Sequence, residues 1–198
     1  MAQRLGRLNP ESCVFFICDI QERFRPGIHK FATVVQGAQR LIRVANALEI
    51  AFMVTEQYPK GLGNTVSEID ISSANCVVEK TDFSMMVNGI ATKLQELRGL
   101  GVTDVVIVGL EAHVCVQQTT LDLLASGYQV HLCVDAVSSQ STLDRACGLH
   151  RADRAGAFLT TTESVLFELL RSKDHPKFKN VQAILKETRP EEPLEWLG

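Results

Sequence analysis

The chain has 198 residues, a formal net charge of −3 and six cysteines. This length suits one domain with a sizeable core, and no proline or glycine cluster marks a boundary, so we expect a single domain over residues 1–198. Scattered charges exclude the basic stripe that nucleic acid or a membrane surface requires. No apolar run nears the roughly 20 residues that span a bilayer, and residues 1–10 lack the apolar centre of a secretory signal. We therefore expect a cytoplasmic protein.

Short apolar runs alternate with segments of helical periodicity. We predict strands at 13–20, 50–55, 76–79, 105–108, 128–134 and 157–161, and helices at 33–48, 89–97, 112–126, 142–152, 163–170 and 178–186. The unbroken run at 105–108 is typical of a parallel strand that helices cover on both faces. The pattern predicts a doubly wound, Rossmann-like α/β/α sandwich with a six-stranded parallel sheet in the order 3-2-1-4-5-6. Its core is expected at about 12–170, with a last helix and tail at 171–198.

The segment EQYPKGLGNT follows the second predicted strand. Pro59, Gly61 and Gly63 predict that it is irregular. Substrate contacts in this fold class lie just beyond the carboxyl ends of strands. Glu56, Gln57 and Tyr58 are therefore candidates for a pocket wall, with an ordinary surface loop as the alternative.

Three reactive side chains, Asp19, Lys80 and Cys115, each follow a predicted strand. Cys115 lies in the first turn of a predicted helix, where unpaired N–H groups and the macrodipole favour a thiolate. In the expected strand order Asp19 and Cys115 face each other, and Lys80 must lean across two strand spacings, about 10 Å. The plainer alternatives are that Asp19 is a turn residue, that Lys80 is a solvated lysine and that Cys115 is a buried core thiol.

The remaining cysteines follow no metal spacing such as C-x-x-C, and Cys13, Cys18, Cys76 and Cys133 fall in strand-like runs. They are most simply reduced core thiols. The sequence after residues 105–108 also lacks the G-x-G-x-x-G pattern of a dinucleotide site. We expect no cofactor.

Three segments, CDIQ at Asp19, EKTDFS at Lys80 and GLEAHVCVQQT at Cys115, resemble the isochorismatase-like cysteine hydrolase superfamily in order and interval, over about residues 12–170. The segments TEQYPKGLG, DIQERF and TLDLLASGYQVH resemble its eukaryotic isochorismatase domain-containing proteins, type 2. The resemblance implies a homo-oligomer. Trp196, near the end of the chain, is expected to dock on this subunit or on a neighbour.

The resemblance also implies a catalytic triad. Cys115 would form a thioester, Asp19 would move the protons, and Lys80 would stabilise the charges. A non-proline cis peptide is expected at Leu110–Glu111, and the N–H groups of Glu111 and Cys115 would bind the oxyanion. The expected substrate pocket is formed by Gln21, Phe24, Glu56, Tyr58, Phe83 and Thr119.

Two departures from relatives in the superfamily shape the expected reaction. The segment TEQYPKGLG has no histidine, whereas nicotinamidases hold a metal there, and Cys115 is retained, whereas isochorismatases proper lack it. We therefore expect no metal, and a small amide, carbamoyl or related acyl substrate. The alternative is a binding or scaffold protein whose triad is idle or senses oxidants through a sulfenic acid at Cys115.

Overall fold

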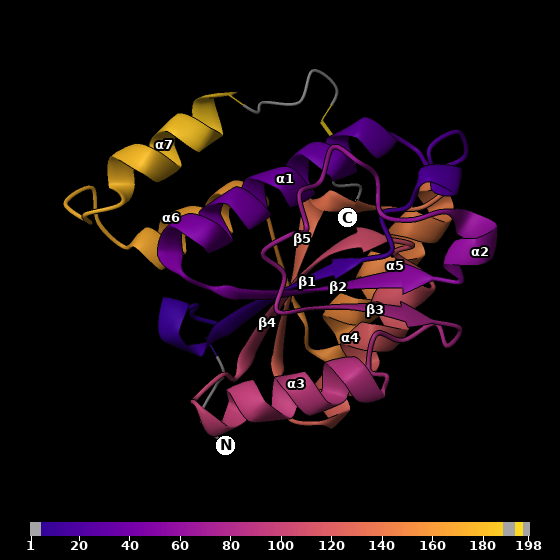
Figure 1. Cartoon of the computed structure of the whole chain (residues 1–198), viewed down its shortest axis with the longest axis horizontal. Helices are drawn as coiled ribbons and strands as arrows, with labels where there is room; N and C mark the ends of the chain where they lie inside the picture. Colours follow the sequence, from indigo (N-terminus) through magenta and orange to yellow (C-terminus); the bar gives the residue numbers. More distant parts are fainter. Residues whose placement is uncertain (1–4, 188–192, 196–198) are drawn as a thin grey trace.

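A computed structural model describes residues 5–187 and 193–195. Its strands are β1 (Cys13–Cys18), β2 (Ala51–Gln57), β3 (Cys76–Lys80), β4 (Asp104–Leu110), β5 (Gln129–Ser138) and β6 (Phe158–Thr160). They form one six-stranded sheet in the order β3-β2-β1-β4-β5-β6, and all of the pairs are parallel. The predicted sheet and its strand order are therefore confirmed (Figure 1).

Helices cover both faces of the sheet (Figure 1). They are α1 (Phe31–Leu48), α2 (Pro59–Leu62), α3 (Asn88–Gly99), α4 (Cys115–Ala125), α5 (Thr142–Ala155), α6 (Thr162–Leu170) and α7 (Phe178–Glu187), with short 3-10 turns at η1 (Pro10–Ser12) and η2 (Glu22–Phe24). One apolar cluster joins the sheet to α1, α6 and α7, and the other joins it to α3, α4 and α5. This is the expected α/β/α sandwich.

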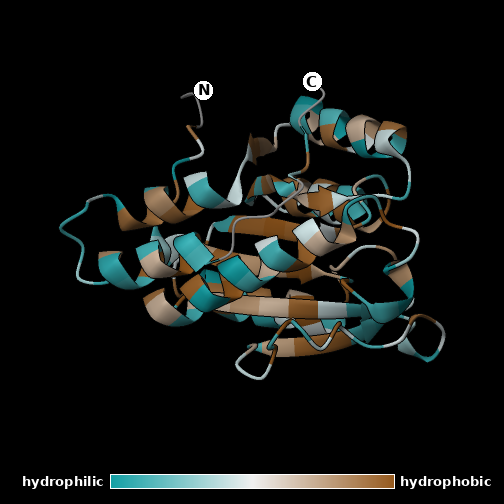
Figure 2. Ribbon diagram, turned by 90° about the horizontal axis from the view of Figure 1, so that it is seen from above, coloured by the Kyte–Doolittle hydropathy of each residue, from teal (hydrophilic) through white to brown (hydrophobic). Residues whose placement is uncertain are grey.

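Alternation along β1 divides its side chains between the two clusters. Phe15 and Ile17 face α1, whereas Phe16 and Cys18 face the side of α4. Every residue of β1 is buried, which explains its unbroken apolar sequence. Figure 2 shows that the strands are largely hydrophobic and that they lie between helices whose outer faces are hydrophilic.

Several predicted boundaries are corrected by the structure. Residues 59–62 form a one-turn helix, because Pro59 occupies the first turn, where its missing N–H costs nothing. Helix α4 begins at Cys115 rather than near residue 112, because residues 112–114 form a turn. Strand β5 continues to Ser138 along β4. The prediction for Trp196 lies outside the described residues.

Across residues 5–187 and 193–195, no helix combines the length and the apolar character that crossing a membrane requires.

Candidate active site

The ends of β1 and β4 approach each other unusually closely at the switch point of the sheet. Cys18 pairs with Gly109, whose φ is +124°, and a Cβ on Gly109 would lie 2.0 Å from the carbonyl oxygen of Cys18. Only glycine fits this backbone conformation and this contact. The contact brings the end of β1 beside the turn that leads from β4 into α4.

Asp19 follows β1 with a φ of +50°, a left-handed conformation that aspartate tolerates better than most residues. Both oxygens of its carboxylate accept a hydrogen bond. The Thr55 hydroxyl donates to Oδ1 at 2.7 Å, and the Lys80 ammonium donates to Oδ2 at 2.7 Å. The side chains of Asp19 and Lys80 are both fully buried. They therefore form an ion pair that is shielded from solvent.

The ammonium of Lys80 is enclosed by acceptors. It also donates to Oε1 of Gln57 at 2.7 Å, to the carbonyl oxygen of Phe83 at 3.0 Å and to that of Asp82 at 3.2 Å. Burial alone would lower the pKa of Lys80, but the pKa is raised, because Cys18, Asp19 and Cys115 surround the ammonium with groups that carry or can acquire negative charge. Lys80 is therefore held as a cation.

Cys115 is the first residue of α4 and keeps 6% of its surface exposed. Its thiol is near the buried thiol of Cys18, since it contributes to the raised pKa of Cys18. The Sγ of Cys18 lies 3.7 Å from Oδ2 of Asp19 and 3.2 Å from the carbonyl oxygen of Leu110. Burial raises the pKa of Cys18 well above its usual range, and Cys115 and Asp19 add to this effect, while Lys80 opposes it. At neutral pH Cys18 is therefore an uncharged thiol, and it lies near both Cys115 and the ion pair.

The turn between β4 and α4 presents two free backbone donors. The Leu110–Glu111 peptide bond is cis. Within residues 5–187 and 193–195, neither the N–H of Glu111 nor that of Cys115 has an acceptor, whereas the N–H of Ala112 donates to Ser138 at 2.9 Å. The Glu111 carboxylate accepts from the N–H of Gln140 at 2.9 Å. The turn is thus fixed from β5, and its two free N–H groups are available to an oxyanion.

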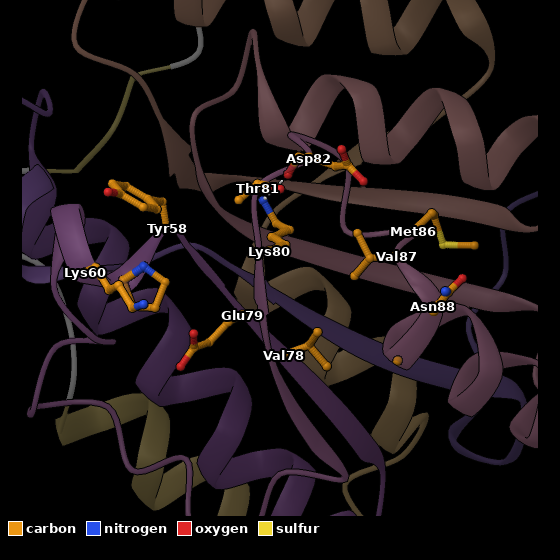
Figure 3. Close-up of a pocket in the computed structure, with 12 residues that line it drawn as sticks. Tyr58, Lys60, Val78, Glu79, Lys80, Thr81, Asp82, Met86, Val87 and Asn88 are labelled. Carbon is orange, nitrogen blue, oxygen red and sulfur yellow. Dashed lines mark hydrogen bonds between the residues drawn. The ribbon is translucent and has the colours of Figure 1, made fainter.

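Two cavities flank the loop at residues 81–87. The larger, about 690 Å³, lies between α2 and the start of α3, and Tyr58, Lys80 and Val87 are among its lining residues (Figure 3). The smaller, about 420 Å³, reaches α4 at Gln118 and is lined by Phe83. Tyr58 lines the larger cavity and Phe83 the smaller, and the two side chains are 55% and 51% exposed. Asp19 and Cys115 do not line either cavity, although Lys80 borders the larger one.

The other expected pocket residues are engaged inside the protein. Gln21 is buried and bonds the backbone of Gln57 and Gly63 through its amide. Glu56 is buried and accepts from Asn64 and Thr65. Thr119 is buried, donates to the carbonyl oxygen of Cys115 and accepts from the N–H of Met85. Phe24 packs against the apolar cluster below α1.

None of these four side chains lines either of the two cavities, and their role as a substrate surface stays a prediction. The polar groups among them are satisfied by backbone and loop partners, as buried polar groups generally are. They support the site instead. Gln21 and Glu56 hold the loop after α2, and Thr119 ties the loop at 81–87 to α4.

The sequence interpretation missed two residues that contact Asp19 directly, Thr55 and Cys18. The available signal was a polar or thiol residue at the end of an apolar strand, next to the edge where ligands bind. Among the described residues, no three of His, Cys, Asp and Glu come together as they would around a metal ion.

The chain is similar to several known proteins. The model of the isochorismatase domain matches residues 13–164. Isochorismatase domain-containing protein 1 of Danio rerio is 49% identical over 190 residues, which cover 96% of this chain and 66% of that protein. Isochorismatase domain-containing protein 2A of Mus musculus is 44% identical over 191 residues, covering 96% of this chain and 90% of that protein. The predicted likeness to type 2 proteins is confirmed, and it extends to type 1.

A solved structure from Caenorhabditis elegans, described as MAR1 ribonuclease, is 43% identical with a TM-score of 0.89 and covers 97% of this chain and 98% of that one. The present chain spans just under two thirds of the length of the zebrafish relative and nearly all of the mouse and nematode relatives.

Proposed function

Because this chain belongs to the isochorismatase domain family, we propose that it is a cysteine hydrolase that cleaves a small amide, carbamoyl or related acyl C–N bond. One observation carries the proposal. A thiol at the start of a helix lies in a cluster with a buried lysine–aspartate pair, and the unpartnered N–H groups of Glu111 and Cys115 lie in the same turn.

The first half of the reaction forms a thioester. Asp19 takes the thiol proton of Cys115, and the sulfur attacks the acyl carbon of the substrate. The carbonyl electrons move onto oxygen, where the N–H groups of Glu111 and Cys115 would stabilise the charge by about 3 kcal/mol each. When the tetrahedral intermediate collapses, the C–N bond breaks and Asp19 returns the proton to the departing amine.

The second half hydrolyses the thioester. Asp19 takes a proton from water, the resulting hydroxide adds to the acyl carbon, and the same two N–H groups bind the oxyanion again. The C–S bond then breaks, the acid leaves, and the thiol of Cys115 recovers its proton. Every step uses groups of this chain.

Lys80 and Thr55 support the role of Asp19 as a base. The ammonium compensates the buried carboxylate and lies close enough to Cys115 to stabilise a thiolate. The Thr55 hydroxyl donates to the other carboxylate oxygen and fixes its direction. We propose that the substrate is admitted beside the loop at 81–87, where Tyr58 and Phe83 offer aromatic surface.

We also propose that the protein is a homo-oligomer. Tyr58, Val77 and Phe83 are three large exposed apolar side chains on and beside the edge strand β3. Sedimentation of the intact chain tests this, and a monomer at micromolar concentration contradicts it.

A screen for ammonia release tests the hydrolase proposal. Amides and carbamoyl compounds are offered to the wild type, to Cys115→Ala and to Cys147→Ala, which removes an exposed thiol. We expect turnover by the wild type and by Cys147→Ala. Cys115→Ala should retain the thermal midpoint and lose turnover by a factor of about 1,000 or more. Turnover that survives in Cys115→Ala would overturn the proposal.

A redox role is the second candidate, because Cys115 keeps 6% of its surface exposed and lies near a second thiol, Cys18, whose pKa it helps to raise. Peroxide would oxidise the Cys115 thiol to a sulfenic acid and release water. Titration with hydrogen peroxide, read by mass spectrometry alongside the amide screen, separates the two candidates. Oxidation of Cys115 without hydrolysis of any amide favours the redox role. RNA belongs in the same screen, since the nematode relative is described as a ribonuclease, and RNA cleavage that is lost in Cys115→Ala contradicts acyl hydrolysis.

A further inference from the structure

Cys18 occupies the centre of the site, although the hydrolase mechanism does not use it. It is the last residue of β1, it is fully buried, and it faces the same side of the sheet as Cys115. Its Sγ lies 3.2 Å from the carbonyl oxygen of Leu110, and the carboxylate of Asp19 is more distant, at 3.7 Å. Since the Asp19 oxygens already accept from Thr55 and Lys80, the S–H has its best acceptor in Leu110.

We propose that Cys18 is a positioning residue, whose S–H holds the carbonyl of Leu110 and thereby aims the N–H of Glu111 at the oxyanion. The inference rests on the proposed function. A peptide group is planar, so a contact that fixes its oxygen also fixes the direction of its N–H. Cys18 would act on the reaction through Glu111, without touching the substrate.

The surroundings of the turn support this role. The Glu111 carboxylate is held by the N–H of Gln140, and the next N–H, that of Ala112, donates to Ser138. Both contacts come from the end of β5 and the residues after it. Cys18 supplies the contact from β1, so the peptide is held from both neighbouring strands. Burial keeps the pKa of Cys18 far above its usual range, and the thiol therefore remains a donor at neutral pH.

Two reagents separate an effect on the oxyanion from an effect on the thiolate. Iodoacetamide alkylates Cys115 by displacing iodide and forms no oxyanion. A small aldehyde, propionaldehyde, adds to the same sulfur and gives a hemithioacetal, whose oxygen resembles the oxyanion of the reaction. The aldehyde affinity is measured as protection of Cys115 from alkylation, with Cys115→Ala to identify the labelled peptide.

The informative variants are Cys18→Ala, which removes the donor, and Cys18→Ser, which restores one. We expect Cys18→Ala to be alkylated at Cys115 within about twofold of the wild-type rate, and to bind the aldehyde about tenfold more weakly, because misaligning a donor costs less than deleting it. Cys18→Ser should recover most of the affinity. If Cys18→Ala does not fold, Cys18→Val fills the space without a donor.

Unchanged aldehyde affinity in Cys18→Ala or Cys18→Val would overturn the inference. An equal fall in the alkylation rate of Cys115 and in its aldehyde affinity would also overturn the inference, since that result would show that Cys18 acts on the thiolate. Failure of the proposed function looks different, because the wild type itself would then show no protection of Cys115 by the aldehyde.

Discussion

The ammonium of Lys80 lies 2.7 Å from the carboxylate of Asp19, and both side chains are fully buried. Removing two charges from water is costly, and their attraction repays the cost only when further hydrogen bonds complete the pair. Thr55 and Gln57 supply such bonds. The pair comes from β3 and from the end of β1, which are separated by β2, so it connects three strands at the edge where the proposed reaction occurs.

Replacing Lys80 by methionine should leave a buried carboxylate uncompensated. We expect the free energy of unfolding to fall by about 3–5 kcal/mol. Lys93→Met is the matched control, because Lys93 pairs with Glu96 at 2.9 Å on the surface, and it should cost less than about 1 kcal/mol. Urea denaturation measures both.

The double variant Lys80→Met with Asp19→Asn checks the reason for that loss. It removes the uncompensated charge, so it should be more stable than Lys80→Met alone. A double variant whose loss equals the sum of the two single losses would show that the ion pair is not the cause.

The positions of the strand ends were predictable from the sequence, but the directions and partners of the individual side chains at those ends were not. Asp19 and Lys80 could be placed at one sheet edge because apolar runs reveal parallel strands and the strand order follows from topology. Glu56 ends the same kind of run, yet its carboxylate turns to hold Thr65. The direction of a side chain depends on local backbone, such as the left-handed conformations of Asp19 and Tyr58, which sequence patterns do not specify.

Contacts between distant segments were the second part that sequence could not supply. The approach of Cys18 to Leu110 joins residues 92 positions apart, and each residue alone is typical of a buried strand. The same applies to Thr55, since a threonine in an apolar strand is ordinary until Asp19 is found beside it.

Thr55→Val should weaken the site while keeping its shape. The Thr55 hydroxyl donates to the charged Asp19, and a hydrogen bond to a charged group contributes about 1.5–3 kcal/mol. Thr120→Val is the control, because Thr120 is equally buried but donates to a neutral carbonyl of its own helix, so its loss should be about 1 kcal/mol. Chemical denaturation compares the two variants. Equal losses would mean that the charge of Asp19 adds nothing at this position.

Gly148→Ala should disturb the turn between β4 and α4 from the side of α5. A Cβ on Gly148 would lie 2.6 Å from the carbonyl oxygen of Ala112, so the turn or the helix must move. Alanine in a helix interior is otherwise favoured over glycine by about 1 kcal/mol. We therefore expect a lower thermal midpoint and weaker aldehyde binding at Cys115, although helix propensity alone would raise the midpoint.

Gly99→Ala is the matched control, because Gly99 lies in α3 and a Cβ there meets no atom within 4 Å. It should leave the midpoint unchanged or slightly raised. If Gly148→Ala behaves like Gly99→Ala, the close contact between α5 and the turn does not constrain the site.

Three buried thiols should make the protein less stable in alkaline solution. Burial raises the pKa values of Cys13, Cys18 and Cys133 well above the usual range, and nearby acidic groups add to the effect. In the unfolded chain a thiol loses its proton near pH 8.5, while the folded protein still retains it. Above that pH the unfolded state binds fewer protons, so the free energy of unfolding falls by up to about 1.4 kcal/mol per pH unit for each thiol.

Cys133→Ala should reduce the fall in the free energy of unfolding with rising pH by the contribution of one thiol. Urea titrations between pH 8 and 10, in the presence of a reductant, measure the free energy of unfolding of the variant and of Val130→Ala, which truncates another buried residue of β5. We expect Val130→Ala to lower stability equally at every pH, whereas Cys133→Ala flattens its fall with pH. Parallel curves for the two variants would show that Cys133 ionises alike in the folded and unfolded states, contrary to the protonated thiol that its burial implies.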